Sequence, residues 1–166
     1  MAFALRFTAP QRKLVLLLHI LASGAWLGLD VVLAVLVFTA RATSDPQTTA
    51  FCFRALELVA IWPVGTAALA SLVTGVLLGL GSKYGLVRYW WVAVKLAMNV
   101  ILSVLVIFSL RPGLHEVGGY GRRLAADLPT SYDSTTLMMP PIVSTTALLL
   151  AFVLSVYKPW GRTRAA

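Results

Sequence analysis

The chain has 166 residues, of which 59% are hydrophobic and only 12% are charged. An average soluble domain is about half apolar and about a quarter charged. The composition therefore excludes an ordinary water-soluble domain, and it also excludes a disordered chain, which would be rich in charge and poor in apolar residues. The formal net charge is +8, which in a membrane protein first indicates topology rather than a nucleic-acid partner. The single cysteine, Cys52, excludes an intramolecular disulfide and a cysteine-only metal site.

Four apolar runs are long enough to cross a bilayer, which takes about 20 residues. They cover about 14–40, 58–80, 90–110 and 140–157. Such runs must be helical because lipid offers the backbone no hydrogen-bonding partner, and the period-two pattern of a membrane β-barrel is absent. We predict an all-α integral membrane four-helix bundle in which residues 1–166 form a single transmembrane domain. Because the first run continues past a stretch that resembles a signal-peptide cleavage site, we expect the first helix to be retained.

The cations outside these runs are distributed unevenly. The N-terminal segment, the second loop and the C-terminal segment contain no acid and hold Arg6, Arg12, Lys13, Lys83, Arg88, Lys158, Arg162 and Arg164. On the opposite side, five arginines are offset by five acidic residues. Because Lys and Arg are retained in cytoplasmic loops, we predict that both termini are cytoplasmic in a multi-pass protein of the bacterial plasma (inner) membrane. The excess charge then favours anionic lipid, and we expect no nucleic-acid partner.

The third loop, about 111–137, is the longest. It contains Gly118, Gly119 and Gly121 followed by two arginines. Glycines beside arginines can cradle a phosphate, but this spacing fits neither the P-loop nor the dinucleotide fingerprint. We interpret the segment as a flexible outer loop in which His115 is solvated.

Three ionisable residues, His19, Asp30 and Lys95, interrupt the apolar runs. Such residues are costly inside a membrane, so each one is a functional hypothesis. His19 lies about 8 Å into the first helix when each residue adds about 1.5 Å. Lys95 lies at about the same depth in the third helix, because both helices enter from the same side. We therefore expect His19 and Lys95 to meet at one depth.

The polar residues of the spans recur at helical spacing, which places them on shared faces. These faces carry His19, Ser23, Trp26 and Asp30 in the first span, Ser71, Thr74 and Gly75 in the second, and Lys95, Asn99 and Ser103 in the third. Because polar residues of a membrane bundle turn inward, we expect these faces to line one interior site. Gly24 and Gly28 lie beside the first face at a spacing that lets a neighbouring helix approach closely.

Each ionisable residue has two or more interpretations. His19 is either a neutral core imidazole bonded to Ser or Thr, or a cofactor ligand. Lys95 either extends past Trp90 and Trp91 toward the lipid headgroups or serves the interior site. Asp30 stays protonated, bonds Thr or Asn, or serves a proton path.

Several sequence segments resemble known membrane families. The first is "LVLLLHILASGAWLGLD", where a His is followed seven residues later by Trp and then by Gly. It resembles the first helix of the four-helix HemJ-type protoporphyrinogen oxidases and of the copper-resistance protein D group. The segments "IWPVGTAALASLVTGVLLGL", "YWWVAVKLAMNVILSVLVI" and "LSVYKPWGR" are similar to later parts of these proteins. The stretch "GSKYGLVRYWWVAVK" is most similar to bacterial four-helix membrane proteins known only as a domain of unknown function.

The resemblance implies a site. In the oxidases the first-helix His and the third-helix Lys are a functional pair associated with haem b, and they match His19 and Lys95. We expect His19 to be the metal ligand, and Lys95 and Asp30 to be the catalytic residues, Asp30 because it is an ionisable residue inside a membrane span. The expected cofactor-binding residues are His19 and Lys95, which the resemblance implies, together with Ser23, Trp26, Met98 and Asn99 on or beside the same helix faces. For Trp26, Met98 and Asn99, packing is the favoured interpretation. The other axial position of a haem would be Lys95, Met98 or empty; alternatively, Lys95 pairs with a haem propionate.

Three functions therefore compete. The first is a haem b or porphyrin protein with a redox role, resembling a HemJ-like oxidoreductase, for which a porphyrin or a quinone would be the small-molecule partner. The second is a non-enzymatic subunit or scaffold, as a homodimer or within a larger membrane complex. The third is transport of copper or a small molecule.

Overall fold

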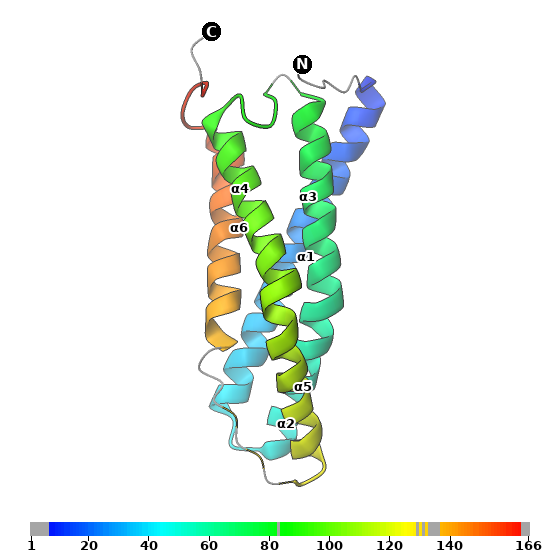
Figure 1. Cartoon of the computed structure of the whole chain (residues 1–166), viewed down its shortest axis with the longest axis vertical. Helices are drawn as coiled ribbons and strands as arrows, with labels where there is room; N and C mark the ends of the chain where they lie inside the picture. Colours follow the sequence, from blue (N-terminus) through cyan, green and yellow to red (C-terminus); the bar gives the residue numbers. More distant parts are fainter. Residues whose placement is uncertain (1–6, 83, 129, 131, 133–136, 164–166) are drawn as a thin grey trace.

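The computed structural model describes residues 7–82, 84–128, 130, 132 and 137–163. Its helices form four long rods (Figure 1). The first rod is α1 (Ala9–Ala42) and the last is α6 (Met139–Tyr157). The second joins α2 (Pro46–Val59), the π-helical segment η1 (Ala60–Val64) and α3 (Gly65–Leu80). The third joins α4 (Trp90–Val104), the π-helical segment η2 (Leu105–Leu110) and α5 (Arg111–Ala125).

Each rod contains a helix long and apolar enough to cross a membrane. These helices are Ala9–Ala42, Pro46–Leu80, Trp90–Phe108 and Met139–Tyr157. The predicted all-α four-helix fold is therefore confirmed, and each of the four apolar runs coincides with one rod. No β-strand is present in the part of the chain that is described, where an isolated antiparallel bridge joins Tyr89 to Arg162.

Local signals explain where the rods begin. At α1 the Thr8 side chain accepts a hydrogen bond from the Gln11 backbone N–H, while the Gln11 side chain accepts one from the Thr8 N–H, so the two residues form a capping box. At α2 the Asp45 carboxylate accepts the N–H groups of Gln47 and Thr48, and Pro46 occupies the first turn. These caps place the helix starts several residues before the apolar runs begin.

The bundle has two chemically different ends. In Figure 1 the start of α1, the end of α6 and the connection from α3 to α4 lie at one end, and α2 and α5 lie at the other. The first end, which we call the positive end, carries Arg12, Lys13, Arg88, Lys158 and Arg162. The three cation-rich segments thus share one side, as their charge pattern predicts, and the assignment of that side to the cytoplasm stays a prediction.

The opposite end corrects the interpretation of residues 111–137 as a flexible loop. Residues 111–125 are the helix α5, which packs against α2. Two of its glycines face that helix: a Cβ at Gly118 would lie 1.7 Å from Glu57 Oε2, and one at Gly121 would lie 2.9 Å from the Ala50 carbonyl oxygen. The glycine cluster therefore serves close helix packing. Helical spacing does give α5 one apolar face, on which Leu114 and Val117 are buried. The sequence does not show that α2, which is far away along the chain, covers that face.

An ion pair ties these two helices together. Glu57 of α2 accepts hydrogen bonds from His115 Nδ1 at 2.8 Å and from Arg122 Nη1 at 2.6 Å, both on α5. His115 is 65% exposed but has a partner, so the expectation of a merely solvated side chain is corrected. The rod from Pro46 to Leu80 has 35 residues, which at about 1.5 Å per residue exceeds a hydrocarbon core of about 30 Å. The α2–α5 pair therefore extends beyond the membrane-spanning part.

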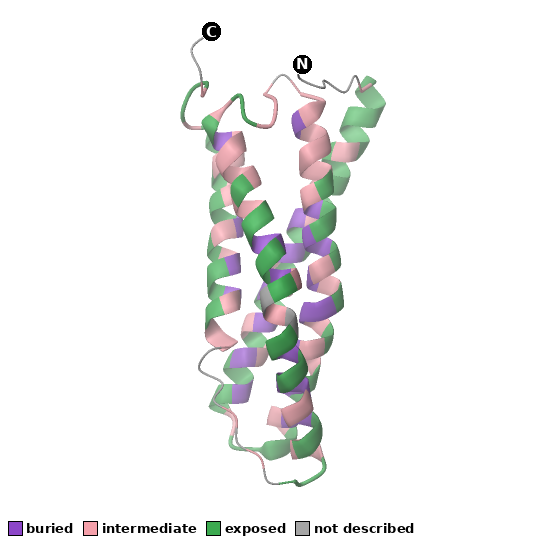
Figure 2. Cartoon of the chain, viewed as in Figure 1, coloured by how far each residue is buried: buried purple, intermediate pink, exposed green. Residues whose placement is uncertain are grey.

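Exposed residues cover most of the outer surface of the rods, and the buried residues are interspersed along them (Figure 2). Large side chains such as Leu21, Ile101 and Leu150 are more than half exposed, as a lipid-facing surface requires. Ser23, Ser71, Ser103 and Ser144 are buried. The interior thus holds the groups that lipid would not tolerate, beside an apolar cluster centred on residues such as Trp26.

Candidate functional site

A cavity of about 400 Å³ lies among α1, α3, α4 and α6, toward the positive end. Its lining is largely apolar, and its polar residues include His19, Ser23, Ser71, Lys95, Asn99 and Ser155. We call it the His19 cavity. Its volume falls within the range of about 300–1,000 Å³ typical of ligand pockets, and a few converging polar groups on apolar walls are the usual composition of such pockets.

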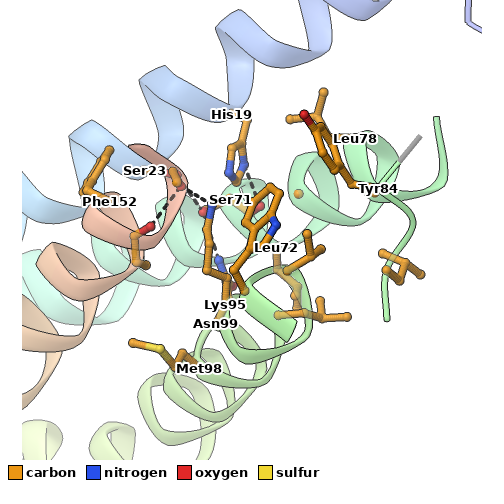
Figure 3. A pocket seen from close by; sticks show the side chains of 18 of the residues that line it. His19, Ser23, Ser71, Leu72, Leu78, Tyr84, Lys95, Met98, Asn99 and Phe152 are labelled. Carbon is orange, nitrogen blue, oxygen red and sulfur yellow. Dashed lines mark hydrogen bonds between the residues drawn. The ribbon is translucent and has the colours of Figure 1, made fainter. Parts of the chain in front are cut away.

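The imidazole of His19 is held against α3. Its Nδ1 lies 3.1 Å from the carbonyl oxygen of Ser71 (Figure 3) and 3.0 Å from Thr74 Oγ1. The carbonyl oxygen can only accept, and the Thr74 hydroxyl already donates to the Ala70 carbonyl at 2.6 Å. The proton therefore belongs on Nδ1, which leaves the lone pair on Nε2. No other described residue occupies Nε2, so this nitrogen is available to a ligand in the cavity.

Gly75 of α3 leaves room for the His19 ring. A Cβ at Gly75 would lie 3.1 Å from His19 Cε1, so a larger residue at 75 would press on the ring. By contrast, a Cβ added at Gly24 or at Gly28 would meet no atom within 4 Å. The expected close approach of a neighbouring helix at Gly24 and Gly28 is therefore absent from the described bundle, and the close contact involves Gly75 instead.

Ser71 is the centre of the polar network. Its Oγ lies 3.0 Å from Ser23 Oγ and accepts a hydrogen bond from Asn99 Nδ2, also at 3.0 Å. Asn99 Oδ1 in turn accepts from Ser103 Oγ at 3.3 Å. Ser71 is 1% exposed. The network joins α1, α3 and α4 where a lone hydroxyl would be costly, so it fixes the rotation of these helices relative to one another.

Lys95 points into the bundle. Its Nζ donates a hydrogen bond to Ser155 Oγ of α6, and it lies 5.8 Å from the centroid of the Trp91 ring. Ser155 Oγ donates its own hydrogen bond to the Ala151 carbonyl at 2.9 Å. Of the two alternatives for Lys95, the interior one is the observed conformation. Across the described part of the chain no carboxylate pairs with Lys95, so the cavity contains a cation without a counter-ion.

Asp30 lies outside the His19 cavity. It is eleven residues beyond His19 on α1, which is about 16 Å along the helix axis. It lines a second cavity of about 220 Å³ rather than the His19 cavity, and Oδ2 accepts a hydrogen bond from Ser144 Oγ of α6 at 2.6 Å. The one interior site expected from the polar faces is therefore two sites.

Two further candidates have different surroundings. Trp26 is fully buried in the apolar cluster and lines neither cavity, and its Nε1 has no hydrogen-bond partner among the described residues. Met98 lines the His19 cavity, but Figure 3 places its thioether well apart from the His19 ring. Met98 thus belongs to the wall rather than to the polar network.

The structure also adds residues that the sequence predictions omit. Ser144 and Ser155, the partners of Asp30 and Lys95, are both on α6. They are eleven residues apart, which at about 100° per residue places them within about 20° of one face. This spacing in the sequence is the signal that could have identified Ser144 and Ser155 as inward-facing residues. In the described residues, no three His, Cys, Asp or Glu side chains come together as a metal-binding group.

Comparison with known proteins gives a family. No curated protein and no solved structure matches the chain. The family model described as "Predicted integral membrane protein (DUF2269)" matches residues 13–159, which include most of the first rod, the other three rods, and His19, Asp30 and Lys95. The chain therefore belongs to this family of predicted integral membrane proteins.

Proposed function

We propose that this membrane protein binds haem b or a related porphyrin in the His19 cavity and serves a redox role, as the resemblance to the HemJ-type oxidases and the copper-resistance protein D group implies. The observation that carries the proposal is the orientation of His19. Its Nδ1–H is held by the Ser71 carbonyl, and Nε2 is left available beside a cavity. Histidines that ligate metals commonly donate their other ring N–H to a carbonyl or carboxylate in this way.

The remaining lining supports the same ligand class. A porphyrin is a flat apolar ring with carboxylate side chains, and the cavity combines apolar walls with the unpaired cation of Lys95. His19 would be the axial ligand, and Lys95 would neutralise a propionate. A bound haem supplies one-electron redox chemistry. The chain's own residues would orient the ligand and place positive charge beside it, from Lys95 and from Arg12, which also lines the cavity.

Pigment formation tests the proposal. The purified protein is titrated with haemin, and the Soret absorption is followed. We expect a saturable shift in the wild type and its loss in His19→Ala. His115→Ala is the matched control because His115 is an exposed histidine at the opposite end. The absence of any shift in the folded wild-type protein, or an equal shift in both variants, would contradict the proposal. Competition of haemin by a quinone measures whether the second ligand class shares the cavity.

We further propose a location in the bacterial plasma membrane with the positive end in the cytoplasm. The support is the clustering of Arg12, Lys13, Arg88, Lys158 and Arg162 at that end. Fusing a reporter that is active only in the cytoplasm to the C-terminus tests this orientation. The same reporter inserted after Asp127, at the opposite end, is the matched control and should be inactive.

A second candidate function is that of a non-enzymatic subunit, either as a homodimer or within a larger complex. One observation favours it: Gly24 and Gly28 leave open space on the outside of α1. Small residues at this spacing let another membrane helix approach closely. Gly24→Leu should then weaken co-purification with the partner, whereas Gly65→Leu, which also has open space around it, should not.

A further inference from the structure

The second cavity is the strongest feature that the proposed function leaves unused. It lies among α1, η1, α4, η2 and α6, where both π-helical segments occur. Met139, which lines it, is 62% exposed, so the cavity reaches the surface of the bundle. Leu102 lines both cavities and lies between them. The second cavity is therefore a compartment separate from the His19 cavity.

Asp30 is the ionisable group in that compartment. It is 2% exposed, and Oδ2 accepts one hydrogen bond, from Ser144 Oγ at 2.6 Å. The other residues that line the second cavity are not ionisable, whether they come from α1, η1, α4, η2 or α6. No cation among the described residues pairs with the Asp30 carboxylate. An ionised carboxylate with one hydroxyl as its partner is costly in an apolar interior, so this position calls for a positive ligand.

The lining decides which positive ligand fits. Hard metal cations such as Ca²⁺ take six to eight oxygen ligands. The side chains of this cavity offer the carboxylate of Asp30 and the hydroxyl of Ser144. A proton needs one carboxylate oxygen, and the neutral acid that results still exchanges hydrogen bonds with the hydroxyl. The chemistry of the lining thus favours a proton over a metal ion.

We propose that Asp30 and Ser144 form a proton-binding site, which takes up and releases its proton through the second cavity. The second cavity adjoins the polar network of the His19 cavity. Leu102 lines the second cavity, and the next residue, Ser103, donates a hydrogen bond to Asn99. Trp26, whose Nε1 is buried without a partner among the described residues, is one helical turn before Asp30 on α1. The proposal does not rest on the binding of a porphyrin, since the residues of the site are distinct from the proposed ligands of the haem.

Carbodiimide labelling tests the proposal without any added cofactor. N,N′-dicyclohexylcarbodiimide dissolves in membranes and adds to the protonated form of a carboxyl group. The protein is treated in liposomes over a range of pH and mapped by peptide mass spectrometry. We expect an adduct on Asp30 that declines as the pH rises, no adduct at this position in Asp30→Asn, and an unchanged adduct in Asp45→Asn. Asp45 is the matched control because its exposed carboxylate caps α2.

Three results would overturn the proposal. They are the absence of an adduct on Asp30 in the wild-type protein, labelling of Asp30 no greater than that of the surface carboxylates, and protection of Asp30 by Na⁺ at constant pH. The last would assign the site to a metal cation. Because the wild-type map decides the first two results, the test remains valid even where Asp30→Asn fails to fold. Haemin titration is a separate measurement, so the failure of one proposal would leave the other standing.

Discussion

His19 on α1 donates its Nδ1–H to the carbonyl oxygen of Ser71 on α3, at 3.1 Å. A backbone carbonyl holds the ring, so changing the Ser71 side chain leaves this acceptor in place. The same residue's hydroxyl holds Ser23 and Asn99. Ser71 therefore performs two separable tasks, one through its backbone for the candidate ligand and one through its side chain for helix association.

Replacing Ser71 with Ala tests this separation. We expect the variant to lose about 0.6–2 kcal/mol of stability, which is the measured range for hydrogen bonds between membrane helices, and to retain haemin binding. Thermal unfolding in detergent and the haemin titration measure the two effects. Thr146→Ala, which removes an exposed hydroxyl bonded within its own helix, should change neither. Loss of pigment with unchanged stability would mean that the hydroxyl, rather than the carbonyl, serves the ligand.

Gly75→Ala should weaken haemin binding about tenfold, because displacing a ligating group by a fraction of an ångström is costly in a preorganised site. The added Cβ would lie 3.1 Å from His19 Cε1 and would press on the ring. Gly65→Ala on the same helix adds a Cβ into open space and should leave the affinity unchanged. Equal affinities in the two variants would show that the ring does not depend on the space at Gly75.

Lys95→Met should lower the affinity for haemin by about ten- to a hundredfold, since a charge-assisted hydrogen bond to a carboxylate is worth roughly 1.5–3 kcal/mol. The same variant should hardly affect the affinity for haemin dimethyl ester, in which the carboxylates are masked. Lys13→Met removes an exposed cation of α1 at the same end and serves as the control for general electrostatic attraction. An equal loss for the acid and the ester would mean that Lys95 acts through packing.

Gly118→Ala should destabilise the α2–α5 pair by about 1–3 kcal/mol, the usual cost of overpacking. Its Cβ would overlap Glu57, whose carboxylate binds His115 and Arg122. Gly113→Ala on the same helix meets no atom within 4 Å, and it should be neutral or stabilising by about 0.5–1 kcal/mol. Thermal unfolding compares the two variants, and equal melting temperatures would contradict the close packing of α5 on α2.

The cap of α2 gives a pH-dependent contribution to stability. Hydrogen bonds from the Thr48 hydroxyl, the Thr48 N–H and the Gln47 N–H hold the pKa of Asp45 below its ordinary value. The folded state therefore binds this proton more weakly than the unfolded state. The stabilisation is complete above the ordinary carboxyl pKa and is lost as the pH falls through the lowered value. Asp45→Ala should be less stable than the wild type near neutral pH, and the difference should vanish in acid. Asp45→Asn keeps a cap and should remove the pH dependence.

The sequence alone determined the four membrane-spanning helices, the grouping of the cations at one end and the similar depth of His19 and Lys95. These properties follow from local rules, because lipid requires long apolar helices and helical rise converts residue number into depth. The tertiary structure decided which side chains meet. Asp30 shares a face with His19 in the sequence, yet it lines a separate cavity with Ser144. The glycines of residues 111–125 looked like part of a loop until α2 supplied the surface on which α5 packs. Such contacts depend on the rotation and register of helices that are distant in the chain, which hydropathy and spacing do not encode.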